Sequence, residues 1–416
     1  MTSSAPSTSA STSPPRRHEA LRSRVERRYL GGIRFHPPRV PLTVEEAYVI
    51  DAALGAGGHR GDAVVRLTSG DVAWAHEVGL ASRLPRSAVA AVDPDSDRRA
   101  RAVDELRVAA TSATILAAAD DEDIPVVFLK GAALVLGNLT APGQRPMVDV
   151  DVLVAPRHAP RLQQRLVEQS GFVALDVPEC EHQLRPLRHA HRLTVEIHTM
   201  IPGLRVGEGF ATADELLEEG LVCGLDVAGH RAWRPVNEVL LAHALVHGLA
   251  QHGFTPLAYP MTRMLADAVD LGLTADQVDP VHRFIRGDIH RDEVSATAVL
   301  VERLHRGVSA AVIAADDDGA ARLLRHMVLG TRDPHYADAL RLWSLFAVPS
   351  ERSRTERAAR MVARALWPTR GQLAQIYGPP ASEFDRWRQR AMRPFDLVRR
   401  GHRYLLAAAR ARPDAT

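Results

Sequence analysis

The chain has 416 residues, of which 46% are hydrophobic and 25% are charged, so it has enough apolar material for a buried core. Its formal net charge of +2 gives no global reason to expect nucleic-acid binding, and its two cysteines are too few for a disulfide framework. No uninterrupted apolar run approaches the roughly 20 residues of a membrane-spanning helix. These features predict a cytoplasmic protein without a membrane partner, for which nucleic acid is not the favoured partner.

The chain is expected to begin with a tail and a helical region. Residues 1–18 are rich in Ser, Thr and Pro and have no apolar stretch, which predicts a disordered tail without an export signal. Residues 19–104 have a mostly helical pattern that should end in a loop, and a long helix should then run up to Pro125. The residues that share one face of this helix at a spacing of 3.6 are Leu106, Ala109, Ala113, Leu116 and Ala117.

A short α/β segment follows directly after Pro125. Residues 126–129 (VVFL) predict a buried strand, and the chain restarts as a short helix after Gly131. Residues 147–154 (MVDVDVLV) alternate with a period of two, so Asp149 and Asp151 should point to the same side of a strand. The sequence therefore places two carboxylates where a buried strand would otherwise be apolar.

A second alternating strand is expected downstream, after a helix that Gly171 closes. Residues 191–201 (HRLTVEIHTMI) put Glu196 on one face together with Thr194 and His198. Three carboxylates can thus converge from two strands, those of Asp149, Asp151 and Glu196. Burying them without a counter-charge would be costly, and one or two divalent cations such as Mg²⁺ would remove that cost and assist phosphoryl displacement. The alternative is that the Asp-x-Asp run is an ordinary solvated strand end.

Lys130 is the only lysine among the 52 basic residues of the chain. It directly precedes Gly131, in a strand–glycine–helix arrangement that can aim backbone N–H groups at a phosphate. A compact ammonium beside phosphates is a role that a guanidinium does not fill equally well. This usage favours a triphosphate site at Lys130, against the alternative of chance.

The run "LKGAAL…RPMVDVDVLV…GF…VEIHT" resembles the uncharacterised nucleotidyltransferases of the DNA-polymerase-beta-like nucleotidyltransferase superfamily. The resemblance covers about residues 105–270. It implies that Asp149 and Asp151 bind Mg²⁺, or Mn²⁺ as the alternative, and that Glu196 is the third ligand or the base. It also implies a nucleotide-binding set formed by Lys130, Gly131 and Arg145, in which Arg145 reaches a phosphate.

The chain departs from the superfamily pattern in three places. Ala132 stands where Gly or Ser is usual, Glu196 replaces the more usual Asp, and the segment from Gly131 to Asp149 is longer than in minimal enzymes. The first and third departures favour an alternative in which the domain binds a nucleotide or a protein without catalysis.

The histidine clusters of the chain are interpreted as structural and not as metal sites. His243 and His247 lie i,i+4, with His252 one turn further, but Ala244 occupies the position of a metalloprotease glutamate. We expect these histidines to face the cleft or the helical core, and we find no recognisable metal-ligand spacing in His189, His191 and His198.

Two further charged features are expected to be solvated. Arg263 and Asp267 are interpreted as a surface ion pair on a helix, although the resemblance places a similar aspartate near the cleft. The arginine-rich C-terminal segment is interpreted as a solvated helical face.

The predicted fold class is α+β, with a small mixed-sheet nucleotidyltransferase core flanked by N- and C-terminal helical regions. The expected divisions are a disordered tail (1–18), an N-terminal helical region (19–104), the α/β core (105–202), a helical domain (203–345) and an Arg-rich helical region (346–416). The predicted function is Mg²⁺-dependent transfer of a nucleoside monophosphate from an NTP to an acceptor that the sequence does not identify, whether small molecule, protein or RNA. The alternatives are the non-catalytic binding module and, less favoured, a glycosyltransferase with a metal-binding Asp-x-Asp motif.

Overall fold

The computed structural model describes most of the central chain and part of its C-terminal region. The described residues are 41–55, 67–85, 94–141, 143–177, 181–251, 261–286, 291–332, 366–367, 373, 377 and 380–410. The expected tail at residues 1–18 lies outside them, as do Cys180 and His252.

A mixed sheet of seven strands forms the centre, in the order β3-β4-β5-β2-β1-β9-β8. β2 runs parallel to β5 and antiparallel to β1, while β1 runs parallel to β9. β6 and β7 form a separate two-stranded sheet. The strand bounds are β1 Val127–Phe128, β2 Asp149–Leu153, β3 Val173–Ala174, β4 Leu187–Arg188, β5 Thr194–His198, β6 Ile201–Val206, β7 Gly209–Ala211, β8 Val222–Val227 and β9 His230–Pro235. The mixed sheet and its helical flanks confirm the predicted fold class.

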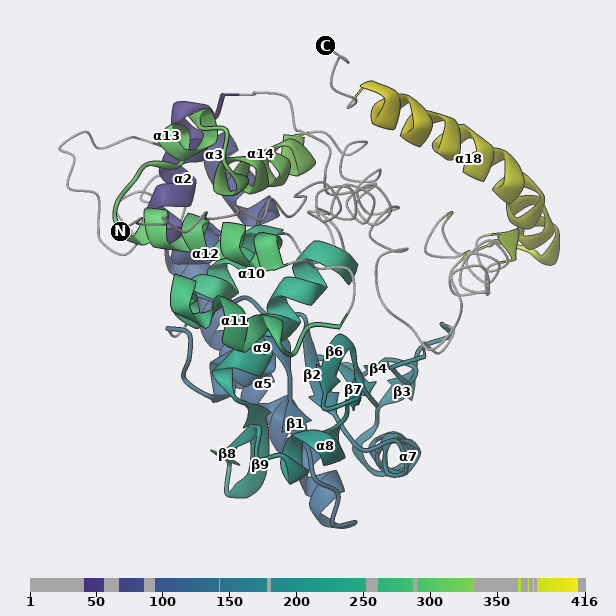
Figure 1. Cartoon of the computed structure of the whole chain (residues 1–416). Coiled ribbons are helices and arrows are strands. Elements are labelled where there is room, and N and C mark those ends of the chain that lie inside the picture. Colours follow the sequence, from purple (N-terminus) through teal and green to yellow (C-terminus); the bar gives the residue numbers. More distant parts are fainter. Residues whose placement is uncertain are drawn as a thin grey trace, which may run out of the picture.

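Helices flank the sheet and continue beyond it as a bundle (Figure 1). The helices up to the end of the sheet are α2 Val44–Leu54, α3 Ser69–Glu77, η1 Ala81–Arg83, α5 Pro94–Asp120, α6 Lys130–Leu136, α7 Ala159–Ser170 and α8 Ala213–Glu218. Those after it are α9 Asn237–Val246, η2 His247–Gln251, α10 Met261–Asp270, η3 Ala275–Gln277, α11 Val278–His282, α12 Arg291–His305, α13 Ala310–Ala315, α14 Gly319–Arg332 and α18 Glu383–Arg410. α5 and α7 pack against each other and on the sheet, as do α6 and α9.

Local sequence signals account for several element ends. Gly171 has a φ of 71° and closes α7, as expected, because glycine adopts this left-handed conformation without steric cost. β1, α6, β2 and β5 all form within the predicted segments. At the start of α9, Val236 is the N-cap and Asn237 is the first helical residue.

α5 differs from the expectation in both extent and face. It is one continuous helix from Pro94, where a loop was expected first. Its buried residues include Val108, Thr111 and Ile115, whereas Leu106 is 70% exposed. The buried face was not recognised in the sequence because it includes small polar side chains. Thr111 Oγ1 donates to Arg107 O (2.6 Å) and accepts from the Leu193 amide (3.1 Å), so this side chain is buried with its hydrogen bonds satisfied.

The sheet extends further along the chain than the sequence pattern indicates. β8 and β9 form a hairpin within the segment expected to be helical, and β9 joins β1 at Val127. The turn uses Ala228 and Gly229 at φ 55° and 82°, and the Gly229 amide donates to Asp226. Only Val227 in β8 and Ala232 and Pro235 in β9 are buried, so these strands lack a regular alternation of apolar residues. The division of the chain into domains stays a prediction.

The N-terminal helices pack on the helices that follow the sheet. Arg83 in η1 makes two hydrogen bonds to Asp270 in α10, at 2.9 and 2.7 Å, and its Nε donates to Ala53 O. Asp51 in α2 accepts from the Ser309 hydroxyl and the Ala310 amide at the start of α13. Segments more than 180 residues apart in sequence are therefore joined by buried or half-buried polar contacts.

Among the described residues, we find no helix that is both long enough and apolar enough to cross a membrane.

Candidate functional site

The strand register brings the predicted carboxylates together. In the parallel pair of β2 and β5, Asp151 lies opposite Glu196 and Asp149 lies opposite Thr194. Since side chains alternate along a strand, Asp149, Asp151 and Glu196 share one face of the sheet. The convergence expected from the sequence is thus present in the fold.

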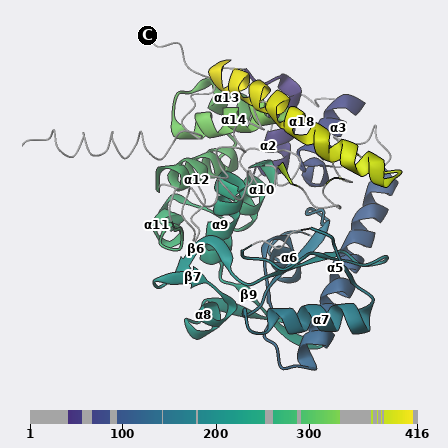
Figure 2. The same ribbon diagram turned by 90° about the vertical axis from the view of Figure 1, so that its right-hand side faces the viewer.

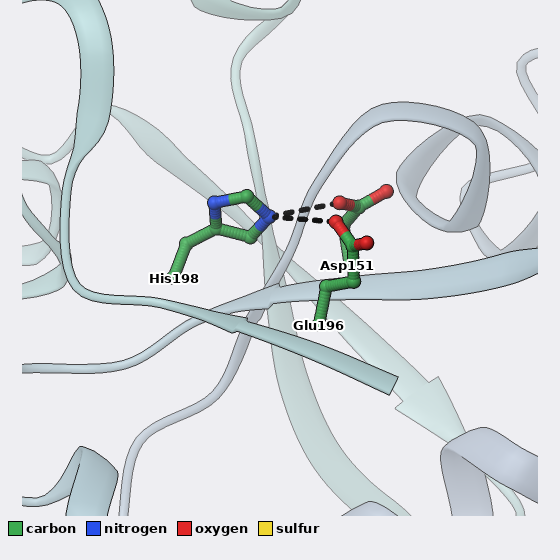
Figure 3. Close-up of side chains that lie close together, drawn as sticks. All are labelled: Asp151, Glu196 and His198. Carbon is green, nitrogen blue, oxygen red and sulfur yellow. Dashed lines mark hydrogen bonds and ion pairs between the residues drawn. The ribbon is translucent and has the colours of Figure 1, made fainter. Parts of the chain in front are cut away.

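His198 joins this group, although the sequence analysis did not select it. Its Nε2 lies 2.8 Å from Asp151 Oδ1 and 3.7 Å from Glu196 Oε2. Figure 3 shows the imidazole edge facing both carboxylates. One atom each from Asp151, Glu196 and His198 lies within 4.8 Å of the others, which is close enough to hold a metal ion. The available signal was its position two residues after Glu196 on the same strand face.

Lys130 lies at the first turn of α6 and points at the carboxylates. Its Nζ is 2.6 Å from Asp151 Oδ1, and its side chain is only 15% exposed. The backbone φ of 47° places this lysine in the left-handed region, which is uncommon for a residue with a β-carbon and occurs often at functional sites. In this structure Lys130 is the counter-ion of Asp151.

Gly131 allows α6 to approach the segment before β2. A β-carbon at this position would lie 2.4 Å from Met147 Sδ and 3.2 Å from Arg145 Nε. Glycine is therefore required by close packing, and any side chain here would displace Met147, which is itself buried.

Arg145 is held by Asp267, which corrects one expectation. Arg145 Nη2 lies 3.0 Å from Asp267 Oδ2, and the two side chains are 7% and 4% exposed. Asp267 is therefore buried beside the site, whereas the sequence predicted that it lies in an ion pair at the helix surface. Helical spacing alone suggested Arg263 as its partner, but the tertiary fold brings Arg145 to it across more than 120 residues.

Burial and mutual repulsion shift the pKa values of the carboxylates in opposite directions. Burial and the charge of Asp151 raise the pKa of Glu196 to about 7 and that of Asp149 to about 6. Burial also opposes ionisation of Asp151, but the Lys130 ammonium and the His198 hydrogen bond outweigh it and hold its pKa well below the usual range. Burial lowers the pKa of His198, so its neutral ring donates through Nε2 to the ionised Asp151.

The donor set fits a divalent cation. Three carboxylates face one ammonium, and burial together with this excess of negative charge raises the pKa values of Asp149 and Glu196. Carboxylate oxygens suit Mg²⁺, and an added imidazole nitrogen is compatible with Mn²⁺. A cation held by Asp151 and Glu196, with Asp149 on the same face and His198 beside Asp151, would remove the repulsion between the carboxylates.

A small cavity adjoins the site on the side of α9 and α10. Its volume is about 10 Å³, roughly that of one water molecule, and Lys130, His243, His247 and Asp267 are among its lining residues. His243 and His247 are buried, with ring centroids 5.9 Å apart, which confirms that they face the cleft and the core. Burial and then the Lys130 charge lower the pKa of His243 well below its usual value.

Comparison with known proteins finds similarity to nucleotidyltransferases. Residues 80–279 match the model of a family described as uncharacterised nucleotidyltransferase, and this stretch contains the whole sheet and every predicted site residue. The solution structure of the antibiotic-resistance factor ANT(2'')-Ia is similar at 16% identity and a TM-score of 0.32, over 43% of this chain and 90% of its own. No curated protein matches the chain.

Proposed function

We propose that this protein transfers a nucleoside monophosphate from an NTP to an acceptor, with a divalent cation held by the acidic face. The observation that carries the proposal is the register of β2 and β5, which sets Asp151 beside Glu196 with Asp149 on the same face. The family match supports nucleotidyl transfer over the glycosyltransferase alternative.

The residues of this chain would divide the work as follows. Asp149, Asp151 and Glu196 would hold the cation, and His198 would orient Asp151 through its 2.8 Å hydrogen bond. A bound Mg²⁺ would neutralise the phosphate oxygens and orient the donor for in-line displacement. The Lys130 ammonium and the backbone N–H groups after Gly131 would contact the triphosphate. Arg145 would contribute to the positive potential from its place against Asp267.

Removing the two β2 carboxylates tests this mechanism. The double variant Asp149→Asn with Asp151→Asn should lose Mg²⁺ binding and NTP turnover, with turnover falling by at least about a thousandfold because the cation would have no anchor. Calorimetry measures the metal, and release of pyrophosphate from each NTP measures turnover. Asp149→Asn alone is the second variant, because Asp151→Asn also deprives Lys130 of its counter-ion.

A matched control removes two carboxylates elsewhere. Asp276→Asn with Asp279→Asn changes the same charge on η3 and α11, far along the chain from the acidic strands, and should leave turnover unchanged. Intact turnover in the Asp149/Asp151 variant would exclude the proposed mechanism.

One observation favours a second candidate, a non-catalytic binding module. Lys130 already neutralises Asp151, and Asp267 already neutralises Arg145, so the site has internal partners for two of its charged groups. This candidate predicts nucleotide binding that does not depend on Mg²⁺ and is not followed by pyrophosphate release. Titration with ATP, GTP, CTP and UTP, with and without Mg²⁺, separates the two candidates. Incubation with α-labelled NTPs and a cell extract would then identify the acceptor.

A further inference from the structure

The C-terminal helix α18 exposes its apolar side. Figures 1 and 2 both place this helix at the outside of the molecule. Its exposed large apolar side chains, which we call the apolar face, are Phe384, Trp387, Met392, Phe395 and Val398. At 3.6 residues per turn they lie within an arc of roughly 140° on one side of the helix.

The opposite, arginine-bearing side of α18 turns toward the protein. Arg386, Arg390 and Arg393 are half-buried, and the Arg390 guanidinium lies 5.4 Å from the ring centroid of Trp367. The Tyr377 hydroxyl donates to Asp396 on the same side. A helix on a globular protein usually buries its apolar stripe and exposes its charges. Here the arrangement is reversed for Arg386, Arg390 and Arg393, which corrects the expectation of a solvated face for these three arginines, whereas Arg388 and Arg399 are exposed as expected.

The helix also concentrates positive charge. It contains eight arginines and three carboxylates, a net charge of +5, whereas the whole chain carries +2 and the remaining residues therefore carry −3. Arg388 and Arg399 are exposed and lie within the same arc, between Phe395 and Met392 in a view down the helix axis. Aromatic residues and arginines on one exposed side of a helix suit a membrane interface, because arginine side chains can extend to the lipid headgroups.

We propose that α18 docks this protein on an anionic phospholipid surface through its apolar face. A bilayer contacts only one side of a helix lying on it, and one side is what α18 leaves open. A partner protein that encloses the whole helix in a groove would have to break the contacts that Arg390 makes with Trp367 and Asp396 makes with Tyr377. If a second copy of the chain covered this face, its α18 would lie against the first α18, and two helices that each carry a charge of +5 repel each other.

A helix can lie on a bilayer without crossing it, and among the described residues no helix is long and apolar enough to cross one. An interfacial helix needs a wide apolar face and flanking basic residues rather than about 20 consecutive apolar ones. The expectation of no membrane partner rested on spanning segments alone.

Vesicle binding by the full chain tests the proposal. The protein should float with phosphatidylcholine vesicles that contain phosphatidylglycerol, should bind pure phosphatidylcholine at least about tenfold more weakly, and should lose affinity as salt is raised. Trp387→Ala with Phe395→Ala should weaken binding by at least about tenfold. The matched control, Leu106→Ala with Val312→Ala, removes two equally exposed apolar side chains on α5 and α13 and should bind like the wild type.

The position of the helix gives a second readout. Bromolipids should quench tryptophan emission in the wild type, and most of that quenching should be lost in Trp387→Phe, which keeps an aromatic ring and should still bind. Absence of binding to anionic vesicles, or binding that the Trp387/Phe395 variant retains, overturns the proposal. A dimer that this variant dissociates, without vesicle binding, would assign the face to a second copy instead.

Discussion

At the scale of single residues, the sequence predicted which carboxylates converge and missed what neutralises them. Asp149, Asp151 and Glu196 could be placed because strand periodicity fixes the side on which each one lies. The contacts of Lys130 and Arg145 could not be placed, because the sequence says nothing of how α6 and α10 pack on the sheet. His198 lies two residues after Glu196 on the same face of its strand. Spacing alone did not distinguish it from His189 or His191 as a member of the site.

The structure gives the lone lysine a more specific role than the sequence could. Lys130 Nζ lies 2.6 Å from Asp151, its side chain is 15% exposed, and it lines a cavity of only about 10 Å³. A guanidinium, which is bulkier than an ammonium, would press on these buried neighbours. A compact cation is therefore required by packing as well as by charge.

Substituting Lys130 separates these two requirements. Lys130→Met should destabilise the metal-free protein by about 3 kcal/mol, because it leaves Asp151 buried without its counter-ion. Lys130→Arg keeps the charge but overpacks the site and should cost about 1–3 kcal/mol. Urea unfolding in EDTA measures both free energies.

Magnesium provides the control for the Lys130 variants. If the cation occupies the acidic face, Mg²⁺ should raise the urea midpoint of Lys130→Met more than that of the wild type, since the cation replaces the lost ammonium. An unfolding curve for Lys130→Met that matches the wild type in EDTA would contradict the assigned role of Lys130.

At the scale of elements, strong periodicity was reliable and weak periodicity was not. β2 and β5 alternate cleanly and lie where expected, whereas β8 and β9 have no regular alternation of apolar residues and were missed. The face of α5 was wrong because hydrogen-bonded Thr111 is buried while Leu106 is exposed. A pattern of apolar residues cannot identify a small polar residue that tertiary contacts bury.

The contact between η1 and α10 is the clearest test of how the N-terminal helices are held. Arg83→Met should destabilise the protein by about 3–5 kcal/mol, because Asp270 would stay buried without a counter-charge. The Arg83 and Asp270 side chains are only 7% and 9% exposed, so water cannot replace the lost partner. Thermal or urea unfolding measures the change.

An exposed ion pair serves as the control. Arg291→Met removes the partner of Asp279, but these side chains are 58% and 71% exposed, so the expected change is within about 1 kcal/mol. Equal effects of the two substitutions would show that the Arg83 contact is not what holds η1 to α10.

At the scale of the whole molecule, the chain joins two surfaces of different character. The acidic face lies within the sheet, and the apolar face of α18 lies at the periphery. The sequence predicted an arginine-rich, helical C-terminal region with a solvated face, but the spacing of its apolar residues is the same whether they face the core or solvent. Only the packed structure distinguishes the two.

The stability of the whole chain should depend on pH through the acidic face. The pKa values of Glu196, about 7, and Asp149, about 6, are raised above their ordinary values. Folding therefore favours their protonated forms, so this contribution to stability is complete below the ordinary carboxyl pKa and is lost as pH rises through 6 and 7. In EDTA, this contribution should lower the melting temperature between about pH 6.5 and about pH 8, above the range in which the buried His198 and His243 favour folding as pH rises.

Magnesium should reverse that trend, because cation binding displaces the same protons. The rise in melting temperature on adding Mg²⁺ should be larger at about pH 8 than at about pH 5.5, where protons compete with the cation. Glu196→Gln should reduce both the fall in EDTA and the rise with Mg²⁺, whereas Glu302→Gln, at the partly exposed pair with Arg306, should change neither. A magnesium-induced shift that is equal at the two pH values would mean that Asp149 and Glu196 do not hold the cation.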